Sequence, residues 1–283
     1  MRTTVVLATT IGTLFLFQAE TRGQNFTVAT SCSVFSIGER SLYACVNGNG
    51  PATVVLEAGM REDSRAWRFM IEDLSKFATV ISYDRAGMGR SEAALAPRTS
   101  EKIALELKAL LDCIDASAPY VLVGHSAGGW HLRAFAHFYP HAVAGLVLID
   151  SPHENFERRR DEILTMEELR QRQAMLAESR AGLPEAIRLE YEGLEQSRAL
   201  YPKLKLPRDL PLVVLAAGRH QWLPEHNAQQ QEEIWRELQG ELAALSANGK
   251  LIVVTDSGHN MQREKPETVV KAIRDVIDQA HAH

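Results

Sequence analysis

This 283-residue chain has few cysteines, few aromatic residues and no excess of basic residues. Its 31 lysines and arginines stand against 36 aspartates and glutamates, so the formal net charge is −5. Because a chain without basic excess has little attraction for a phosphate backbone, we expect no nucleic-acid partner. No uncharged apolar run reaches the roughly 20 residues of a bilayer-spanning helix, so we expect no stable membrane span. The length fits one large α/β domain or two smaller domains.

The N-terminus has the character of a secretory signal peptide. Met1-Arg2 gives a short positive start, residues 3–17 carry no charge, and residues 18–24 are polar. Charged, apolar and polar segments in this order, with small residues near the end, are typical of such peptides. We expect cleavage after Gly23, or after Ala19, and export to the periplasm or the medium. An uncleaved N-terminal membrane anchor is the alternative.

Two of the three cysteines face each other in a predicted hairpin. Residues 32–45 have the pattern of two short strands joined at Gly38-Glu39, with glycine at the first position of a type II′ turn. In that register Cys32 lies opposite Cys45 at a non-hydrogen-bonded pair, whose Cα separation of about 4.5 Å is within disulfide range. We predict a disulfide between them, which suits an oxidising compartment. Cys113, inside a helical pattern, is predicted to be a buried apolar residue.

Short apolar runs recur along the rest of the chain and predict a parallel sheet. They are continuous rather than alternating, as expected for strands that are covered on both faces. Helical patterns lie between most of them, including 100–114 with Thr99 or Ser100 as N-cap, and a last helix beginning at Pro266. This alternation predicts an α/β fold with a mostly parallel twisted sheet and helices on both faces. The predicted strands are 53–57, 79–84, 120–124, 145–150, 212–218 and 250–255.

One long interval, residues 153–209, contains no strand signal. Its sequence is charged and helical in pattern, as in 158–180. An insertion of this length predicts a helical cap between strands 6 and 7, over the sheet edge where ligands bind in such folds. The alternative is a solvated surface excursion. We therefore expect an α/β core of residues 24–152 and 210–283, with a helical cap of residues 153–209.

A serine in a glycine-rich turn is the predicted nucleophile. Residues 124–128, Gly-His-Ser-Ala-Gly, fit the G-x-S-x-G pattern between a predicted strand and a predicted helix. Such a turn exposes the Ser126 hydroxyl above the sheet, at a helix N-terminus where backbone N–H groups can meet an oxyanion. The flanking glycines are needed because the neighbouring chain approaches too closely for a Cβ. A serine that serves only the turn is the alternative.

A serine nucleophile needs a base, and the base needs an orienting acid. His259 follows the last predicted strand in a Ser-Gly-His turn and is the predicted base. His220 and His226 follow the preceding strand and are weaker candidates. The histidines that sit beside or along the helix after Ser126 are not expected to reach its hydroxyl; they are His125, His131, His137 and His141.

These motifs resemble the α/β-hydrolase superfamily across residues 30–280. The segment 83–91, YDRAGMGRS, resembles the family's D-x-x-G-x-G-x-S turn after the fourth strand, and 263–273, REKPETVVKAI, resembles its final helix. The resemblance implies the α/β-hydrolase fold and serine-hydrolase chemistry without a cofactor or a metal ion. It also implies that Asp84 in the turn is structural.

The acid departs from the superfamily's common pattern. In most members it follows the strand that here is 212–218, after which no aspartate or glutamate occurs until Glu225. In a subgroup the acid follows strand 6, where this chain has Asp150. The resemblance therefore implies that Asp150 is the acid, with Glu225 and Asp256 as alternatives.

The oxyanion hole departs from the pattern as well. The family's His-Gly-x loop here reads Glu57-Ala58-Gly59-Met60. Because the donors are backbone groups, the N–H groups of Met60 and Ala127 are implied to form the hole. The candidates for the border of the pocket are His153, Trp67, Trp130 and Trp222, although core packing explains each tryptophan equally well.

The sequence thus predicts an exported serine hydrolase that cleaves an ester or related acyl bond of a small molecule through an acyl-enzyme. A dehalogenase or epoxide hydrolase is disfavoured, because relatives with those activities carry an aspartate where Ser126 stands. A cofactor-free perhydrolase or a C–C hydrolase would share the same triad. The alternative from another class is a small-ligand binding protein on the hydrolase scaffold.

Overall fold

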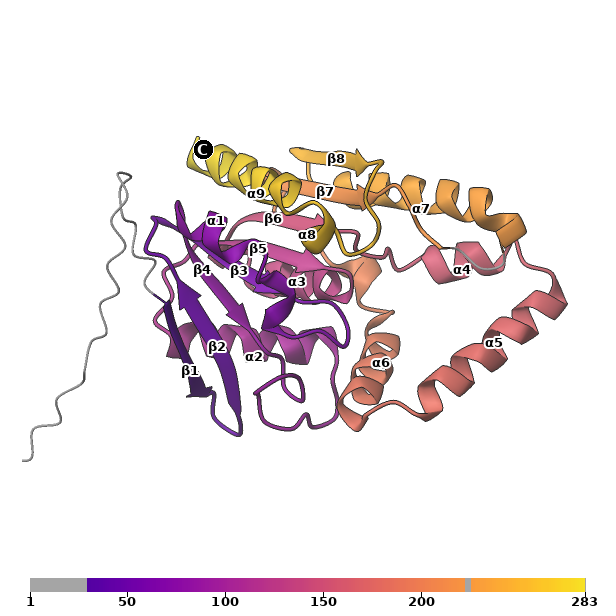
Figure 1. The fold of residues 1–283 in the computed structure, drawn as a ribbon, viewed down its shortest axis with the longest axis horizontal. Coiled ribbons are helices and arrows are strands. Elements are labelled where there is room, and N and C mark those ends of the chain that lie inside the picture. Colours follow the sequence, from indigo (N-terminus) through magenta and orange to yellow (C-terminus); the bar gives the residue numbers. More distant parts are fainter. Residues whose placement is uncertain (1–29, 222–224, 283) are drawn as a thin grey trace, which may run out of the picture.

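The computed structural model describes residues 30–221 and 225–282, which form an eight-stranded sheet with helices on both faces (Figure 1). Strands β3 to β8 run parallel to one another, and the hairpin of β1 and β2 joins them antiparallel through β4. The six predicted strands and the mostly parallel sheet are confirmed. In spatial order the strands are β1 (Thr30–Ser36), β2 (Ser41–Asn47), β4 (Ala78–Tyr83), β3 (Ala52–Glu57), β5 (Tyr120–His125), β6 (Val143–Ile149), β7 (Leu212–Ala217) and β8 (Gly249–Val254).

The predicted signal peptide, residues 1–23, lies outside the described residues. Within residues 30–221 and 225–282, none of the helices combines the length and the apolar character that a bilayer crossing requires.

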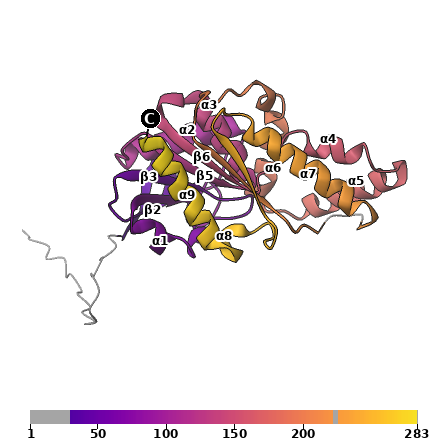
Figure 2. The ribbon, with the colours of Figure 1, turned by 90° about the horizontal axis from the view of Figure 1, so that it is seen from above.

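Helices cover both faces of the sheet because its central strands carry mostly apolar side chains that are buried on both sides. β3, β5 and β7 are buried along their whole length. One face packs against α2 (Ser100–Cys113), α3 (Ala127–Phe138) and α7 (Ala228–Ala243). The other face packs against α1 (Ile71–Ser75) and α9 (Pro266–His281). Figure 2, seen from above, shows the sheet between α9 and the pair α2 and α3.

The two helices that the apolar spacing indicates most clearly form as expected. Thr99 caps α2, because its side chain accepts the backbone N–H of Lys102. Pro266 opens α9, where its missing N–H costs no intrahelical hydrogen bond. The buried residues of the two helices include all the predicted apolar positions: Ile103, Leu107, Leu110 and Leu111 in α2, and Val269, Ile273, Val276 and Ile277 in α9.

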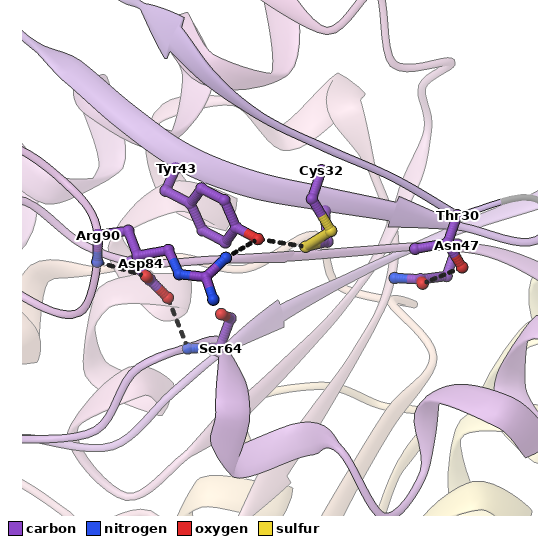
Figure 3. The surroundings of a disulfide bond; sticks show 8 residues. Thr30, Cys32, Tyr43, Asn47, Ser64, Asp84 and Arg90 are labelled. Carbon is purple, nitrogen blue, oxygen red and sulfur yellow. Dashed lines mark hydrogen bonds between the residues drawn. A yellow bond between two sulfur atoms is a disulfide. The ribbon is translucent and has the colours of Figure 1, made fainter. Parts of the chain in front are cut away.

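The N-terminal hairpin has the predicted register and disulfide. Gly38 takes a φ of +100°, which the predicted turn requires of its first position. Cys32 pairs with Cys45 in the ladder, their Cα atoms are 4.0 Å apart, and the disulfide joins them. Figure 3 shows the bond beside Tyr43, whose hydroxyl lies 3.3 Å from the Cys45 Sγ and accepts an N–H of Arg90 at 2.7 Å.

The prediction that Cys113 is buried is wrong. Cys113 is the last residue of α2 and is exposed. Its Sγ lies 3.1 Å from the carbonyl oxygen of Ser36, at the end of β1. β1 is the edge strand and is itself largely exposed, so the end of α2 projects past the apolar part of the sheet.

Between β6 and β7 the chain forms helices and no strand. Figure 1 shows these helices beyond the ends to which the arrows of β7 and β8 point. α6 buries residues of one face, among them Leu189 and Leu194, whereas α5 buries none. The elements are α4 (Phe156–Asp161), α5 (Met166–Ala181), α6 (Glu185–Ser197) and a short 3-10 helix at Tyr201–Lys203.

Candidate active site

Ser126 forms the sharp turn between β5 and α3. Its backbone has φ 51° and ψ −123°, a conformation that is costly for a residue with a side chain and that clusters at functional sites. The Ser126 N–H donates to the carbonyl of Ile149 at 2.9 Å, and its own carbonyl accepts the Ser151 hydroxyl at 2.9 Å. α3 begins at the next residue, so the first N–H groups of that helix, which have no intrahelical partner, lie beside the serine.

The glycines around Ser126 allow this turn to pack tightly. A Cβ on Gly124 would lie 2.7 Å from the amide nitrogen of Gly129. A Cβ on Gly128 would overlap the carbonyl oxygen of Glu57 at the end of β3. The prediction that neighbouring chain excludes side chains at these two positions is confirmed.

Asp150 and His259 meet at the same edge of the sheet. Asp150 directly follows β6, with a φ of +44° and no exposed surface. The Nδ1 atom of His259, in the loop after β8, lies 2.6 Å from Asp150 Oδ2. Because an ionised carboxylate only accepts hydrogen bonds, Nδ1 carries the proton and Nε2 is left as the basic nitrogen. The His259 side chain is 44% exposed and lines the same cavity as Ser126.

The carboxylate of Asp150 is held by donors on every side. Its Oδ1 accepts the N–H of Ala217 at 3.0 Å and the indole N–H of Trp235 at 3.1 Å. His220 Nε2 lies 3.0 Å from Oδ2 and 3.3 Å from Oδ1. Burial alone would raise the pKa of Asp150, but the hydrogen bonds and charges of His220 and His259 outweigh it and hold this pKa well below its usual value. Asp150 is therefore ionised at neutral pH.

His220 contacts Asp150, and the sequence interpretation did not predict this contact. Its Nδ1 lies 2.9 Å from Glu232 Oε2 on α7, so the ring stands between two carboxylates. Burial alone would lower the pKa of His220, but the two carboxylates outweigh it and raise this pKa to about 9. The position of His220 in the sequence could have indicated this contact, because His220 follows the strand after which most of the superfamily carries the acid.

The other candidates for base and acid have different partners. The carboxylate of Asp256 pairs with Lys265 rather than with His259. His226 is largely exposed, and its Nε2 lies 3.0 Å from a carboxylate oxygen of Glu168. The side chain of Glu225 lies outside the described residues.

His125, the residue before the serine, contacts the loop that carries His259. It is almost fully buried, and its Nε2 lies 3.0 Å from the carbonyl oxygen of His259. The two imidazole rings have centroids 4.7 Å apart. On its other side, Nδ1 lies 2.8 Å from Glu62 Oε2. His125 therefore fixes the backbone of the His259 loop. The sequence predicted no role for His125, only that its side chain would not reach the serine hydroxyl.

A buried ion cluster lies at the end of β3. The guanidinium of Arg85 donates to Glu57 Oε1 at 2.7 Å and to Glu190 Oε1 at 2.6 Å, and all three side chains have at most 2% of their surface exposed. Burial alone would lower the pKa of Arg85, but the effect of the two carboxylates is larger and raises this pKa above its usual value. Because Glu190 belongs to α6, the cluster joins the segment between β6 and β7 to the sheet.

The same guanidinium anchors the loop after β3. It donates to the carbonyl of Ala58 at 2.7 Å and to the carbonyl of Gly59 at 2.8 Å. Gly59 precedes Met60, the predicted oxyanion donor, while Ala127, the other predicted donor, is the first residue of α3. Glu57 belongs to the Glu-Ala pair that stands in place of the family's histidine, and it has a structural function because it pairs with the arginine that holds this loop.

Ser126, Asp150 and His259 border one cavity of about 690 Å³. Phe156 and Glu157 of α4 contribute to its wall, so the segment between β6 and β7 borders the cavity. Its other lining residues are Pro152, Arg219, His220, Gln221, Trp235, Gly258, Asn260 and Glu264.

His153 does not line this cavity. Its ring is buried, with Nδ1 accepting the N–H of Asn155 at 3.1 Å and Nε2 3.6 Å from a carboxylate oxygen of Glu241. The ring is thus directed at α7, while its neighbours Pro152 and Phe156 face the cavity.

The two predicted tryptophans that the structure describes, Trp67 and Trp130, do not line it either. Trp130 stacks on Tyr201, with ring centroids 5.3 Å apart, and Trp67 is fully buried in the core. Trp222 lies outside the described residues. Among the described residues, the indole of Trp235 borders the cavity, and the sequence did not distinguish this residue from the other apolar residues of its helix.

Comparisons with known proteins agree with this architecture. A family model described as "Alpha/beta hydrolase family" matches residues 45–272. "Uncharacterized protein YqjL" of Bacillus subtilis is 28% identical over 229 residues, which cover 81% of this chain and 85% of that protein. "Lipase LipV" of Mycobacterium tuberculosis is 33% identical over 174 residues, 62% of each chain. Among solved structures, a thermophilic esterase from Thermogutta terrifontis superposes with a TM-score of 0.61 at 22% identity, covering 89% of this chain and 99% of that one.

Proposed function

This chain belongs to the alpha/beta hydrolase family, and we propose that it is a serine hydrolase that cleaves an ester or related acyl bond through an acyl-enzyme. The observation that carries the proposal is the arrangement at the sheet edge. Ser126 and His259 border one cavity, and His259 Nδ1 lies 2.6 Å from the buried, ionised Asp150. The similarity to a protein named as a lipase and to a solved esterase agrees with this activity.

Each residue has a defined task in this mechanism. Asp150 holds the Nδ1–H of His259, so that Nε2 takes the proton of Ser126 as the hydroxyl attacks the substrate carbonyl. The oxyanion that forms is stabilised by the N–H groups of Met60 and Ala127. His259 then gives its proton to the leaving group, and water repeats the sequence on the acyl-enzyme.

We also propose that residues 153–209 act as the cap of this site, over a core of residues 24–152 and 210–283. The support is that Phe156 and Glu157 of α4 line the cavity and that α6 is tied to the sheet through Glu190. A cavity of about 690 Å³ suits a small-molecule acyl substrate.

Export is part of the same proposal. Residues 1–23 would be the signal peptide. The disulfide between Cys32 and Cys45 is compatible with an oxidising compartment.

The test is hydrolysis of p-nitrophenyl esters of increasing acyl length by wild type and three variants. Ser126→Ala should abolish turnover, and Asp150→Asn should lower kcat by about 10⁴-fold, since the wrong imidazole tautomer is then favoured. The matched control is Asp256→Asn, which should leave kcat unchanged because that carboxylate is exposed and pairs with Lys265. A wild type that turns over none of the esters, or a fully active Ser126→Ala, would contradict the proposal.

A further inference from the structure

We propose that His220 is a positioning residue of this active site. It is an imidazolium that stays protonated at neutral pH, fixes the Asp150 carboxylate and weakens the attraction between that carboxylate and a protonated His259. The inference rests on the proposed function, because it gives His220 a task in the same triad. Its basis is the place of the ring, with one nitrogen 3.0 Å from Asp150 Oδ2 and the other 2.9 Å from Glu232 Oε2.

With both carboxylates ionised, the geometry favours a ring that carries protons on both nitrogens. An ionised carboxylate has only acceptor atoms, and a neutral imidazole has one donor and one acceptor nitrogen. A neutral His220 would therefore direct a lone pair at a carboxylate oxygen on one of its two sides. Only the imidazolium donates to Asp150 and Glu232 together, and the 7% exposure of the ring leaves little room for water to replace either carboxylate.

The charged groups around the ring favour the same state. Asp150 follows β6, Glu232 comes from α7, and His259, after β8, lies on the far side of the shared carboxylate. Trp235 of α7 packs edge-on against the ring, with centroids 5.2 Å apart. The adjacent Arg219 donates to the carbonyl of Asp256.

The cavity-lining carboxylates also have partners of their own. Glu157 of α4 pairs with Arg160 and Arg172, and Glu264 accepts the N–H of Gly258.

His220 acts on both oxygens of the carboxylate. Its Nε2 lies within 3.3 Å of each of them, and the Ala217 N–H and the Trp235 indole hold Oδ1 from other directions. The carboxylate plane is thereby fixed with Oδ2 toward His259. The positive charge of the His220 ring also offsets part of the negative charge of Asp150, so the carboxylate stabilises a protonated His259 less.

The consequence is a kcat/KM profile whose acidic limb lies at lower pH than it would beside a neutral residue. In a triad hydrolase kcat/KM rises with pH as the base of the free enzyme loses its proton. The nitrogens of His220 and His259 lie 3.0 and 2.6 Å from the same oxygen. At a separation of at most about 6 Å, a cation at His220 should hold the acidic limb about one to two pH units lower than a neutral residue would.

The first experiment measures the pH profile of kcat/KM for wild type, His220→Gln and Glu232→Gln. We expect the acidic limb to move to higher pH by about one to two units in His220→Gln and by less in Glu232→Gln, which keeps the ring but removes one carboxylate. The matched control is Glu233→Gln, a neighbouring exposed glutamate bonded to Gln229, whose profile should equal that of wild type. An acidic limb that stays in place or moves to lower pH in His220→Gln overturns the proposal, even if the plateau rate falls.

The second experiment needs no turnover and therefore separates this inference from the proposed function. Nitrogen-15 NMR of the histidine rings is recorded on full-length Ser126→Ala protein, with the His220 signals assigned by their loss in His220→Gln. Both His220 nitrogens should remain protonated through pH 8, since this pKa is raised to about 9. A ring that becomes neutral below pH 8 overturns the inference, whether or not the wild type hydrolyses esters.

Discussion

Replacing Arg85 with leucine should destabilise this protein far more than the loss of an ordinary ion pair. The substitution leaves Glu57 and Glu190 facing each other in a site where neither carboxylate has any exposed surface. It also removes the donors of the Ala58 and Gly59 carbonyls.

The size of the effect follows from this burial. Removing one partner of a buried pair costs about 3–5 kcal/mol, because an uncompensated charge stays behind. Two carboxylates stay behind here, so we expect the upper end of that range. The cost is limited by proton uptake, since burial already raises the pKa of Glu57. An exposed pair provides the matched control: Arg188 and Glu192 are 46% and 49% exposed, and Arg188→Leu should cost about 0–1 kcal/mol.

Urea unfolding followed by tryptophan fluorescence is the assay. With a denaturant slope of about 2–3 kcal/mol per molar, Arg85→Leu should lower the unfolding midpoint by about 2 M. Adding Glu57→Gln and Glu190→Gln should restore part of the loss, because the buried charges are then gone. A midpoint for Arg85→Leu within about 0.5 M of wild type would refute the reasoning.

Two further predictions concern the turn after β5 and the hairpin. Gly128→Ala should lower kcat/KM by about tenfold or more and should also lower the melting temperature, because the added Cβ would overlap the carbonyl at the end of β3. The control is Gly182→Ala, which should change neither quantity because nothing lies within 4 Å of the added atom. Replacing Cys32 and Cys45 by alanine should lower the free energy of unfolding by about 3 kcal/mol in urea titrations and leave kcat/KM unchanged, because the 13-residue loop closes at the sheet edge away from Ser126. Equal stability with and without the disulfide would contradict the second.

The features that could be predicted from the sequence are those that local rules determine. The buried strands had to be continuous apolar runs, and the helices between them showed their apolar faces by spacing. The turn of the first hairpin determines the register of its two strands, and the pairing of Cys32 with Cys45 could therefore be predicted from the position of the turn. The expectation that Asp150 lies beside His259 came from the resemblance to a subgroup of the superfamily, because the strand order alone left Glu225 and Asp256 as alternatives.

The features that could not be predicted depend on contacts between distant segments. His220, Trp235 and Glu190 reach their partners across 70, 85 and 105 positions of sequence, and nothing in their own neighbourhoods specifies those partners. The error at Cys113 has a related cause, because a helical pattern does not tell where the sheet beneath the helix ends.

Covalent labelling of Ser126 tests the central claim most directly. Full-length protein is treated with a fluorophosphonate probe, and the adduct is located by intact mass and peptide mapping. The account predicts one adduct on Ser126, none in Ser126→Ala, and much slower labelling of Asp150→Asn than of Asp256→Asn. A wild type that takes up no probe, or a Ser126→Ala protein that still takes it up, would contradict the account.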